Sequence, residues 1–238
     1  MREPTILFKS LVGSRSYNLH TDESDYDYRY IQVSSLRDAL SPFKHLDTKA
    51  KIDGDNDDAI WEFSAFCKYA ANGNPSVYEA MYSMHYEIGP DPGADVLVSK
   101  LLGNKRKFLD ARRVYDAHRG YASAQLKKIH WDDMESMRTR KAIVAYLRIL
   151  EQGRELLLTG SCNLWLAENS YLREILMSIK QQGFQVYTRQ HIEQLMEIRE
   201  RRITQAFEHT ILTTANYAWI EEFVESVYLS LGRDECAR

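Results

Sequence analysis

The sequence is poor in cysteine and contains no long apolar run, and each of these absences excludes a class of protein. Its three cysteines are odd in number and lie far apart, at Cys67, Cys162 and Cys236. Such spacing argues against a disulfide scaffold and against a CxxC zinc site, and it is typical of a reducing compartment. No apolar run approaches the roughly 20 residues of a membrane span, and the N-terminus lacks the apolar core of a signal peptide. We therefore expect a cytoplasmic protein without a membrane partner.

Several common ligand motifs are also missing from the chain. It has neither a P-loop nor a GxGxxG turn, and no arrangement of residues supports a Ser/His triad. The run Asp53-x-Asp55-x-Asp57 looks like the start of an EF-hand loop, but the sixth position is Asp58 and the twelfth is Ser64. An EF-hand needs glycine and glutamate at these two positions, so a calcium loop of this type is excluded.

The charge of the chain is small overall but unevenly distributed. A net charge of −3 does not suit a protein that wraps nucleic acid with its whole surface. Residues 20–62 carry eleven Asp and Glu against five Lys and Arg, whereas residues 101–154 carry thirteen Lys and Arg against six Asp and Glu. An acidic segment beside a basic one is what a site for metal and phosphate requires. Charge alone, however, favours two solvated faces that share no role.

The sequence pattern of the first third of the chain is typical of a small α+β unit. Residues 5–12 are predicted to form a strand or the end of a short helix. A strand is predicted over 24–33, which is rich in β-branched and aromatic residues, and another short strand over 59–63. A short helix is expected over 34–40, and residues 49–58 are predicted to form a polar, turn-rich loop. A length of 238 residues suggests one large domain or two small ones.

Helical patterns dominate the rest of the sequence. Ser64 is expected to cap a helix over 65–72, and Ser76 to start the next one. The breaker Gly-Pro-Asp-Pro-Gly ends at Gly93 and predicts a boundary between a unit at 1–93 and a helical unit at 94–238. Six helices are predicted beyond it, over about 95–102, 106–130, 135–158, 170–182, 188–208 and 216–231.

Two carboxylates that follow a small-residue turn are the most informative feature of the chain. Gly13-Ser14 comes after an apolar run, and Asp25 and Asp27 lie in a segment that alternates like a strand. Side chains two apart in a strand point to the same face, so we expect these carboxylates to project side by side and to share a cation. A turn that offers N–H groups to phosphate, beside paired carboxylates for metal, indicates phosphoryl or nucleotidyl transfer.

These motifs resemble the signature of the DNA polymerase β-like nucleotidyltransferase superfamily, and more closely the YcgL-type family of predicted nucleotidyltransferases. The opening GS-x-x-YG-L of that family is matched except at Asn18, which stands where glycine is usual and which tolerates a left-handed backbone. The resemblance covers most of residues 8–183 and is weak over the last 50 or so. It is carried by residues 13–19, 24–29, 66–79, 120–128, 140–142 and 147–148.

The resemblance implies a fold and a set of ligands. The fold is a small mixed β-sheet nucleotidyltransferase domain with flanking helices, followed by an all-helical C-terminal domain. Gly13 and Ser14 would hold the triphosphate of a nucleotide, and Asp25 and Asp27 would bind Mg²⁺ or Mn²⁺.

The superfamily also needs a third carboxylate, on a neighbouring strand. Asp57, Asp58 and Glu62 compete for this role as catalytic residue and metal ligand. Asp58 and Glu62 would share one strand face, while Asp57 would lie on the other. Spacing to the helix that contains Phe66 favours Asp57 or Asp58, and the choice between those two stays open.

Three basic residues complete the expected nucleotide site. Lys141 and Arg148 are seven residues apart and therefore share a helical face, from which they could reach the β- and γ-phosphates. An ordinary solvated face is the alternative for this pair. Arg29 is expected either to clamp a phosphate or to form an ion pair with Asp27.

The expected function is metal-dependent transfer of an NMP from an NTP to an acceptor hydroxyl, with release of pyrophosphate. The expected acceptor is the end of an RNA or another nucleic acid. Two alternatives remain open: nucleotidylation of a protein or small molecule, and a nucleotide-binding module without turnover. The sequence carries no signal for an oligomeric state.

Overall fold

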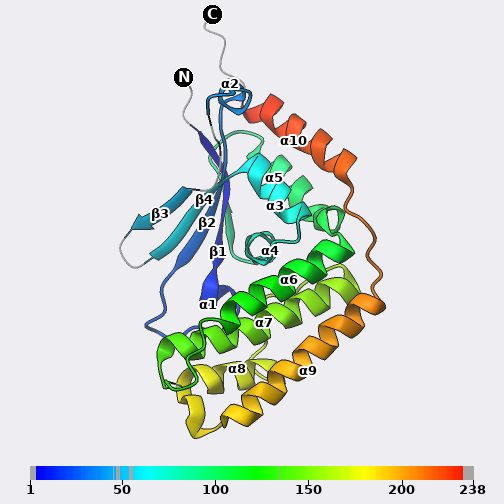
Figure 1. The fold of residues 1–238 in the computed structure, drawn as a ribbon. Coiled ribbons are helices and arrows are strands. Elements are labelled where there is room, and N and C mark those ends of the chain that lie inside the picture. Colours follow the sequence, from blue (N-terminus) through cyan, green and yellow to red (C-terminus); the bar gives the residue numbers. More distant parts are fainter. Residues whose placement is uncertain (1–3, 45, 47–48, 54–55, 134, 233–238) are drawn as a thin grey trace, which may run out of the picture.

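A mixed sheet of five strands forms one side of the protein (Figure 1). The computed structural model describes residues 4–44, 46, 49–53, 56–133 and 135–232, with the backbone alone for residues 49–53, 56, 57 and 184. The strand order is β3-β4-β2-β1-β5; β2 and β4 run parallel, and the other neighbours are antiparallel. The strands are β1 (Thr5–Val12), β2 (Asp27–Val33), β3 (Lys49–Asp53), β4 (Asn56–Glu62) and β5 (Tyr86–Ile88).

The pairing of β1 with β2 brings the two predicted motifs together. The register runs from Thr5 opposite Val33 to Val12 opposite Asp27. Along β1, buried and partly exposed residues alternate over most of the strand, because one face packs on the core. The turn that begins at Gly13 therefore starts beside the first residue of β2.

Two groups of helices pack on the sheet and on each other (Figure 1). The first group contacts the strands: α3 (Phe63–Ala71), α4 (Pro75–Tyr82), α5 (Ala94–Gly103) and α10 (Tyr217–Leu231). The second group forms a bundle around α7: α6 (Ala111–Leu126), α7 (Met137–Thr159), α8 (Tyr171–Gln182) and α9 (Arg189–Glu208). The short elements are α1 (Gly13–Ser16), α2 (Leu36–Ala39) and the 3₁₀ helices η1 (Lys105–Phe108) and η2 (Gly183–Gln185). No helix within the described residues is long and apolar enough to cross a membrane.

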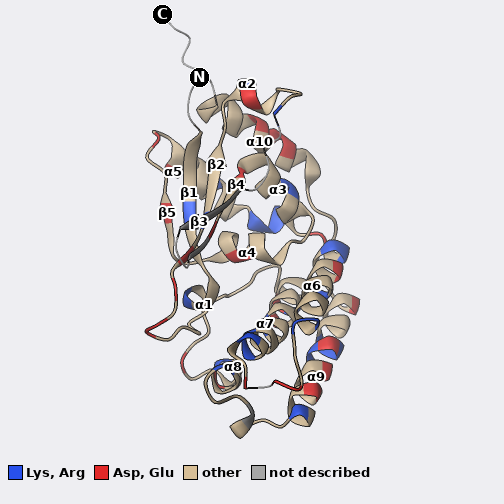
Figure 2. Cartoon of the chain, turned by 60° about the vertical axis from the view of Figure 1, so that its left-hand side comes forward, with Lys and Arg blue, Asp and Glu red and all other residues tan. Residues whose placement is uncertain are grey.

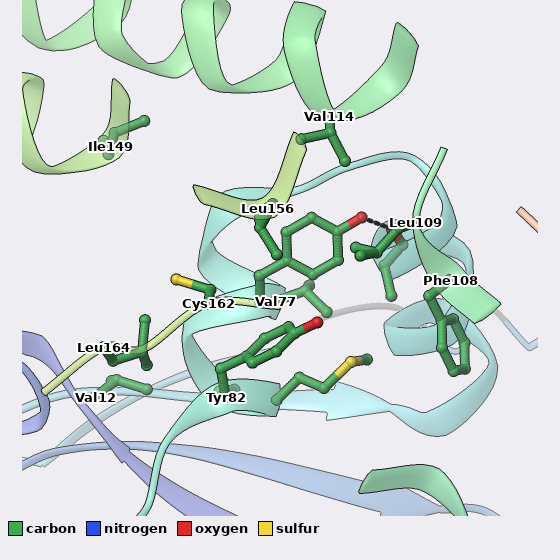
Figure 3. Packing of buried hydrophobic residues seen from close by; sticks show 14 of the residues in the cluster. Val12, Val77, Tyr82, Phe108, Leu109, Val114, Ile149, Leu156, Cys162 and Leu164 are labelled. Carbon is green, nitrogen blue, oxygen red and sulfur yellow. Dashed lines mark hydrogen bonds between the residues drawn. The ribbon is translucent and has the colours of Figure 1, made fainter. Parts of the chain in front are cut away.

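The sheet and the bundle share one hydrophobic core (Figure 3). Val12 of β1, Val77 and Tyr82 of α4, Val114 of α6 and Leu156 of α7 are all buried in this cluster. Burying apolar surface stabilises the fold by about 25 cal/mol per Å². Because this surface comes from both halves of the chain, the two halves are held against each other by the same packing that stabilises each of them.

The α+β class and the predicted order of helices are confirmed. The helix predicted over 106–130 is broken, because Asp110 accepts a hydrogen bond from the Arg113 N–H and starts α6 anew at Ala111. The loop predicted over 49–58 is wrong, since it contains β3 and the start of β4. An Asp-Gly pair between alternating runs is a hairpin signal that the turn-rich interpretation overlooked. The short edge strand β5 was also not predicted.

The starts of two helices differ from the prediction as well. Helix α3 begins at Phe63 with Glu62 at its N-cap, so Ser64 lies inside the helix. Helix α4 begins at Pro75, where the Asn74 side chain accepts a hydrogen bond from the Ser76 N–H at 2.9 Å. Asparagine at the N-cap followed by proline is a stronger signal for a helix start than Ser76, because proline has no N–H that would need a partner in the first turn.

The division into units at 1–93 and 94–238 stays a prediction. Helix α5 follows this boundary and packs on β1 and β5. Helix α10, at the far end of the described chain, returns to pack against α3 and β2. The sheet layer therefore contains helices from both sides of the boundary.

Replacing Gly73 with alanine is expected to destabilise the fold strongly. Gly73 has φ +78°, and a Cβ there would lie 2.5 Å from the backbone oxygen of Arg113 in α6. Gly93 has φ +86° but nothing within 4 Å of a Cβ, so it is a matched control. We expect about 1 kcal/mol for Gly93→Ala, from backbone conformation alone, and about 2 kcal/mol more for Gly73→Ala, from the clash. Urea unfolding measures both, and equal losses would contradict the close approach.

Candidate active site

A pocket of about 670 Å³ lies where the end of β1 meets helices α7 and α8. Its one wall is the α1 turn and the loop that leads into β2, and its other wall is formed by α7 and α8. Figure 2 shows Lys and Arg on α1, α7 and α8, the three helices that border the pocket. The residues predicted to form the site that line this pocket are Gly13, Ser14, Asp25, Asp27, Lys141 and Arg148.

The turn at Gly13 fits only glycine. Its φ is +71°, and a Cβ there would lie 2.5 Å from Oδ2 of Asp27. The Gly13 N–H donates a hydrogen bond of 2.6 Å to Oε1 of Glu79 in α4. The turn is thus fixed by one carboxylate from α4 and lies against a second from β2, so the Asp27 carboxylate is held at the start of α1.

Asp25 and Asp27 both line the pocket, although only one of them belongs to the strand. Strand β2 begins at Asp27, whereas the prediction started it at residue 24, and the exposed Asp25 lies in the preceding loop. Arg15 shapes this loop: its Nη2 donates to the Ser24 carbonyl at 2.7 Å, and its guanidinium lies 3.8 Å from the centre of the Tyr26 ring. These contacts of Arg15 hold the loop on both sides of Asp25, which lines the pocket.

The segment Tyr17–Leu19 is held by donors from the helical half of the chain. The N–H of Leu166 donates to the Tyr17 carbonyl at 3.2 Å, and Nε of Arg173 donates to the Asn18 carbonyl at 2.8 Å. Nζ of Lys180 donates to the Leu19 carbonyl at 2.6 Å. Asn18 has φ 60°, as its tolerance of a left-handed backbone allows. These bonds fix the bundle to the chain directly after the Gly13 turn.

Arg148 is held in a fixed orientation at the wall of the pocket. Its guanidinium lies 3.7 Å from the centre of the Tyr17 ring, and its Nη1 donates to Gln152 Oε1 at 3.2 Å. Gln152 in turn donates to the Tyr17 hydroxyl at 3.2 Å, and burial raises the pKa of that phenol well above its ordinary value. Burial and the nearby charge of Lys141 lower the pKa of Lys180. This wall therefore carries three basic side chains, of which two are oriented by hydrogen bonds.

Arg29 and Asp58 do not line the pocket. Nη1 of Arg29 donates to the Tyr28 carbonyl at 3.2 Å. Asp58 is buried, and its Oδ1 accepts a hydrogen bond of 2.8 Å from the Tyr28 N–H on the neighbouring strand. The side chain of Asp57 lies outside the described part of the structure.

Glu62, the other candidate for the third carboxylate, is fully buried at the far end of β4. Its oxygens accept hydrogen bonds from the Ser34 N–H at 2.9 Å, the Ser34 hydroxyl at 2.7 Å and the Tyr228 hydroxyl at 2.5 Å. Burial and Glu62 raise the pKa of Tyr228. These donors satisfy the carboxylate where it is, so Glu62 joins α10 to the sheet instead of facing the pocket.

Two residues at the site were not given roles from the sequence. Glu79 lies in the segment 66–79 that carried the resemblance, so its acidic side chain there was the available signal. Lys180 lies more than 150 residues from Leu19, and no local pattern could connect the two. Both act on the backbone of the turn and the segment after it.

The sequence matches a family model over residues 2–227, which is nearly the whole chain. That model describes the RlaP family, the RNA repair pathway DNA polymerase beta family. The chain belongs to this family. A search of curated proteins found no match.

Membership supports the resemblance to DNA polymerase β-like nucleotidyltransferases and extends it past the last residues that the motifs covered. It suggests a nucleotidyltransferase, and it does not bear on the YcgL-type name. Such nucleotidyltransferases generally use divalent metals. Among the side chains that the structure describes, no three or more His, Cys, Asp or Glu are grouped so as to hold a metal ion.

Tyr228→Phe is expected to lower the free energy of unfolding by about 1–2 kcal/mol, because Glu62 loses one donor in a buried site. Tyr217→Phe is the control, since Tyr217 lies in the same helix and is 44% exposed. Urea unfolding at neutral pH measures both variants. If the two variants unfold alike, the buried carboxylate does not depend on α10.

Proposed function

We propose that the chain is a divalent-metal-dependent nucleotidyltransferase that moves an NMP from an NTP to a hydroxyl at an RNA end and releases pyrophosphate. The observation that carries this proposal is the pocket, in which Asp25 and Asp27 face the basic side chains of α7. Membership in an RNA repair pathway family supports RNA as the acceptor.

The triphosphate would lie between the Gly13-Ser14 turn and α7. The Ser14 hydroxyl and the backbone of the turn offer hydrogen bonds to phosphate oxygens. Arg148 offers a planar guanidinium in a fixed orientation. The exposed Lys141, on the same face of α7, offers a positive charge on a flexible side chain. The two basic residues therefore suit the β- and γ-phosphates.

Asp25 and Asp27 would hold a divalent ion, Mg²⁺ or Mn²⁺, which supplies neutralisation of phosphate charge when it is bound. Both carboxylates line the pocket, and the Asp27 carboxylate lies against the Gly13 turn that would bind phosphate. The residues present therefore fit such an ion with two ligands from one wall.

Strand register favours Asp57 over Asp58 as the third carboxylate. Arg29 pairs with Ala59 on the parallel strands β2 and β4. Alternation puts position 57 on the face of Ala59 and Asp27 on the face of Arg29, which is the same side of the sheet. Asp58 falls on the opposite face, where it accepts the Tyr28 N–H.

Catalysis by this site would come from positioning and from charge neutralisation. The acceptor oxygen forms a bond to the α-phosphorus as the bond from that phosphorus to the β-phosphate oxygen breaks. Arg148 and Lys141 then lie beside the leaving pyrophosphate. The acceptor proton passes to a carboxylate or to solvent at the pocket mouth.

Asp27→Asn and Asp25→Asn are expected to lower NMP transfer by on the order of 10²-fold or more, because each removes a charged metal ligand. The assay incubates each α-labelled NTP with Mg²⁺ and an RNA oligonucleotide and measures label in the RNA. Asp116→Asn is the control, since Asp116 is exposed on α6 and pairs with Arg112. Undiminished transfer in Asp27→Asn would refute the assignment, and label in protein instead of RNA would refute the acceptor.

Lys141→Gln is expected to raise the KM for NTP about 10-fold with a smaller effect on kcat, because one charge-assisted contact to phosphate is lost. Lys127→Gln is the matched control, since Lys127 is exposed and does not line the pocket. Steady-state rates at saturating RNA measure both constants. An unchanged KM in Lys141→Gln would contradict the assignment and would mean that Lys141 is an ordinary solvated residue that does not bind the nucleotide.

A further inference from the structure

Three arginines surround one carboxylate where α7 packs against α9. Oε1 of Glu151 lies 3.0 Å from Nη1 of Arg154, and its Oε2 lies 3.2 Å from Nε of Arg199 and 3.7 Å from Nη1 of Arg202. We name these four residues the arginine cluster. It lies outside the pocket described above, since none of its members lines that pocket.

The cluster has more positive charge than its one carboxylate can neutralise. Each guanidinium carries five N–H donors. Nε of the buried Arg199 and Oε2 of Glu151 form an ion pair at 3.2 Å, and neither atom has a hydrogen-bond partner among the described residues. Burial lowers the pKa of Arg199. Glu155 lies one turn further along α7, where its Oε2 accepts a hydrogen bond from the Asn163 N–H at 3.2 Å. Three guanidinium groups beside one carboxylate leave positive charge that suits a further anion.

We propose that the arginine cluster binds a backbone phosphate of the single-stranded RNA acceptor. This inference rests on the proposed function for the identity of the acceptor. A phosphodiester oxygen would accept hydrogen bonds from Arg199 and Arg202. The charge of the phosphate and that of Glu151 would together neutralise the three guanidinium groups.

Two further observations favour RNA over a free phosphate. Tyr171, at the start of α8, is 73% exposed, and α8 packs against α7, the helix that carries Glu151 and Arg154. An exposed ring on a helix next to one that carries arginines suits a single strand, because the ring can stack a base while the arginines contact the backbone.

The second observation is position along α7. Arg148 lines the pocket, and Glu151 and Arg154 follow it at three and six residues, or about 5 and 9 Å of helix rise. A stacked strand rises about 3.4 Å per nucleotide, so these distances correspond to one to three nucleotides. Along the axis of α7, a strand whose end lies in the pocket therefore comes level with the cluster within one to three nucleotides.

The test measures fluorescence anisotropy of a labelled single-stranded RNA, without NTP or metal, over a range of salt concentrations. Arg202→Gln is expected to weaken binding at least about 5-fold and to reduce the salt slope by about 0.7. Arg154→Gln, from the other helix, is expected to act in the same way. Arg201→Gln is the matched control, because Arg201 is exposed on α9 next to Arg202 and lies outside the cluster. Tyr171→Ala is expected to weaken binding without changing the salt slope. Tyr217→Ala is the control and is expected to leave binding unchanged.

Equal affinities for Arg202→Gln, Arg154→Gln and Arg201→Gln would overturn the proposal and leave an ion-pair network that only joins two helices. A second arm follows the melting temperature in inorganic phosphate at constant ionic strength. If Arg202→Gln removes stabilisation by phosphate but leaves RNA affinity unchanged, the cluster takes a free phosphate and the RNA proposal is overturned. Because binding is measured without NTP, this failure is distinct from retained NMP transfer in Asp27→Asn.

Discussion

The structure depends on three hydrogen bonds that the helical half of the chain donates to the carbonyls of Tyr17, Asn18 and Leu19. Two of the donors are cationic, and Lys180 is buried, so these charge-assisted bonds form where water competes little. The carbonyls follow the Gly13 turn directly. The bonds therefore decide which face of the bundle meets the end of β1, and without them the pocket would have only its acidic wall.

The same three hydrogen bonds explain how part of the acidic segment comes to lie opposite part of the basic segment. Many of the acidic and basic residues counted from the sequence are exposed in the part of the chain whose side chains the structure describes. In the pocket a few of them face each other: Asp25 and Asp27 from one wall, and Lys141 and Arg148 from the other. Lys141 forms no ion pair with a described residue, while Arg148 is oriented by Tyr17. The basic wall thus has one fixed and one adaptable charge for an anionic ligand.

Local patterns predicted the helices, most strands and six pocket residues, because periodicity and turn chemistry are encoded within a few residues. The sequence could not predict the contacts that cross the chain. The hydrogen bond from Gly13 to Glu79 and that from Lys180 to Leu19 join distant segments. Asp58 illustrates the same limit, since spacing made it a candidate metal ligand, and only the pairing of β2 with β4 shows that its carboxylate accepts the Tyr28 N–H.

Helix α7 connects the pocket to the arginine cluster, and its packing explains why both lie on one element. Gly153 is needed where α6 and α9 close on α7, because a Cβ there would lie 2.8 Å from both His118 and Ile203. This close approach brings α9 near enough for Arg199 to reach Glu151. The opposite part of α7 is left to α8 and the pocket, where Arg148 lies. A single glycine thus allows one helix to serve both sites, so that the spacing between them is set by helix rise.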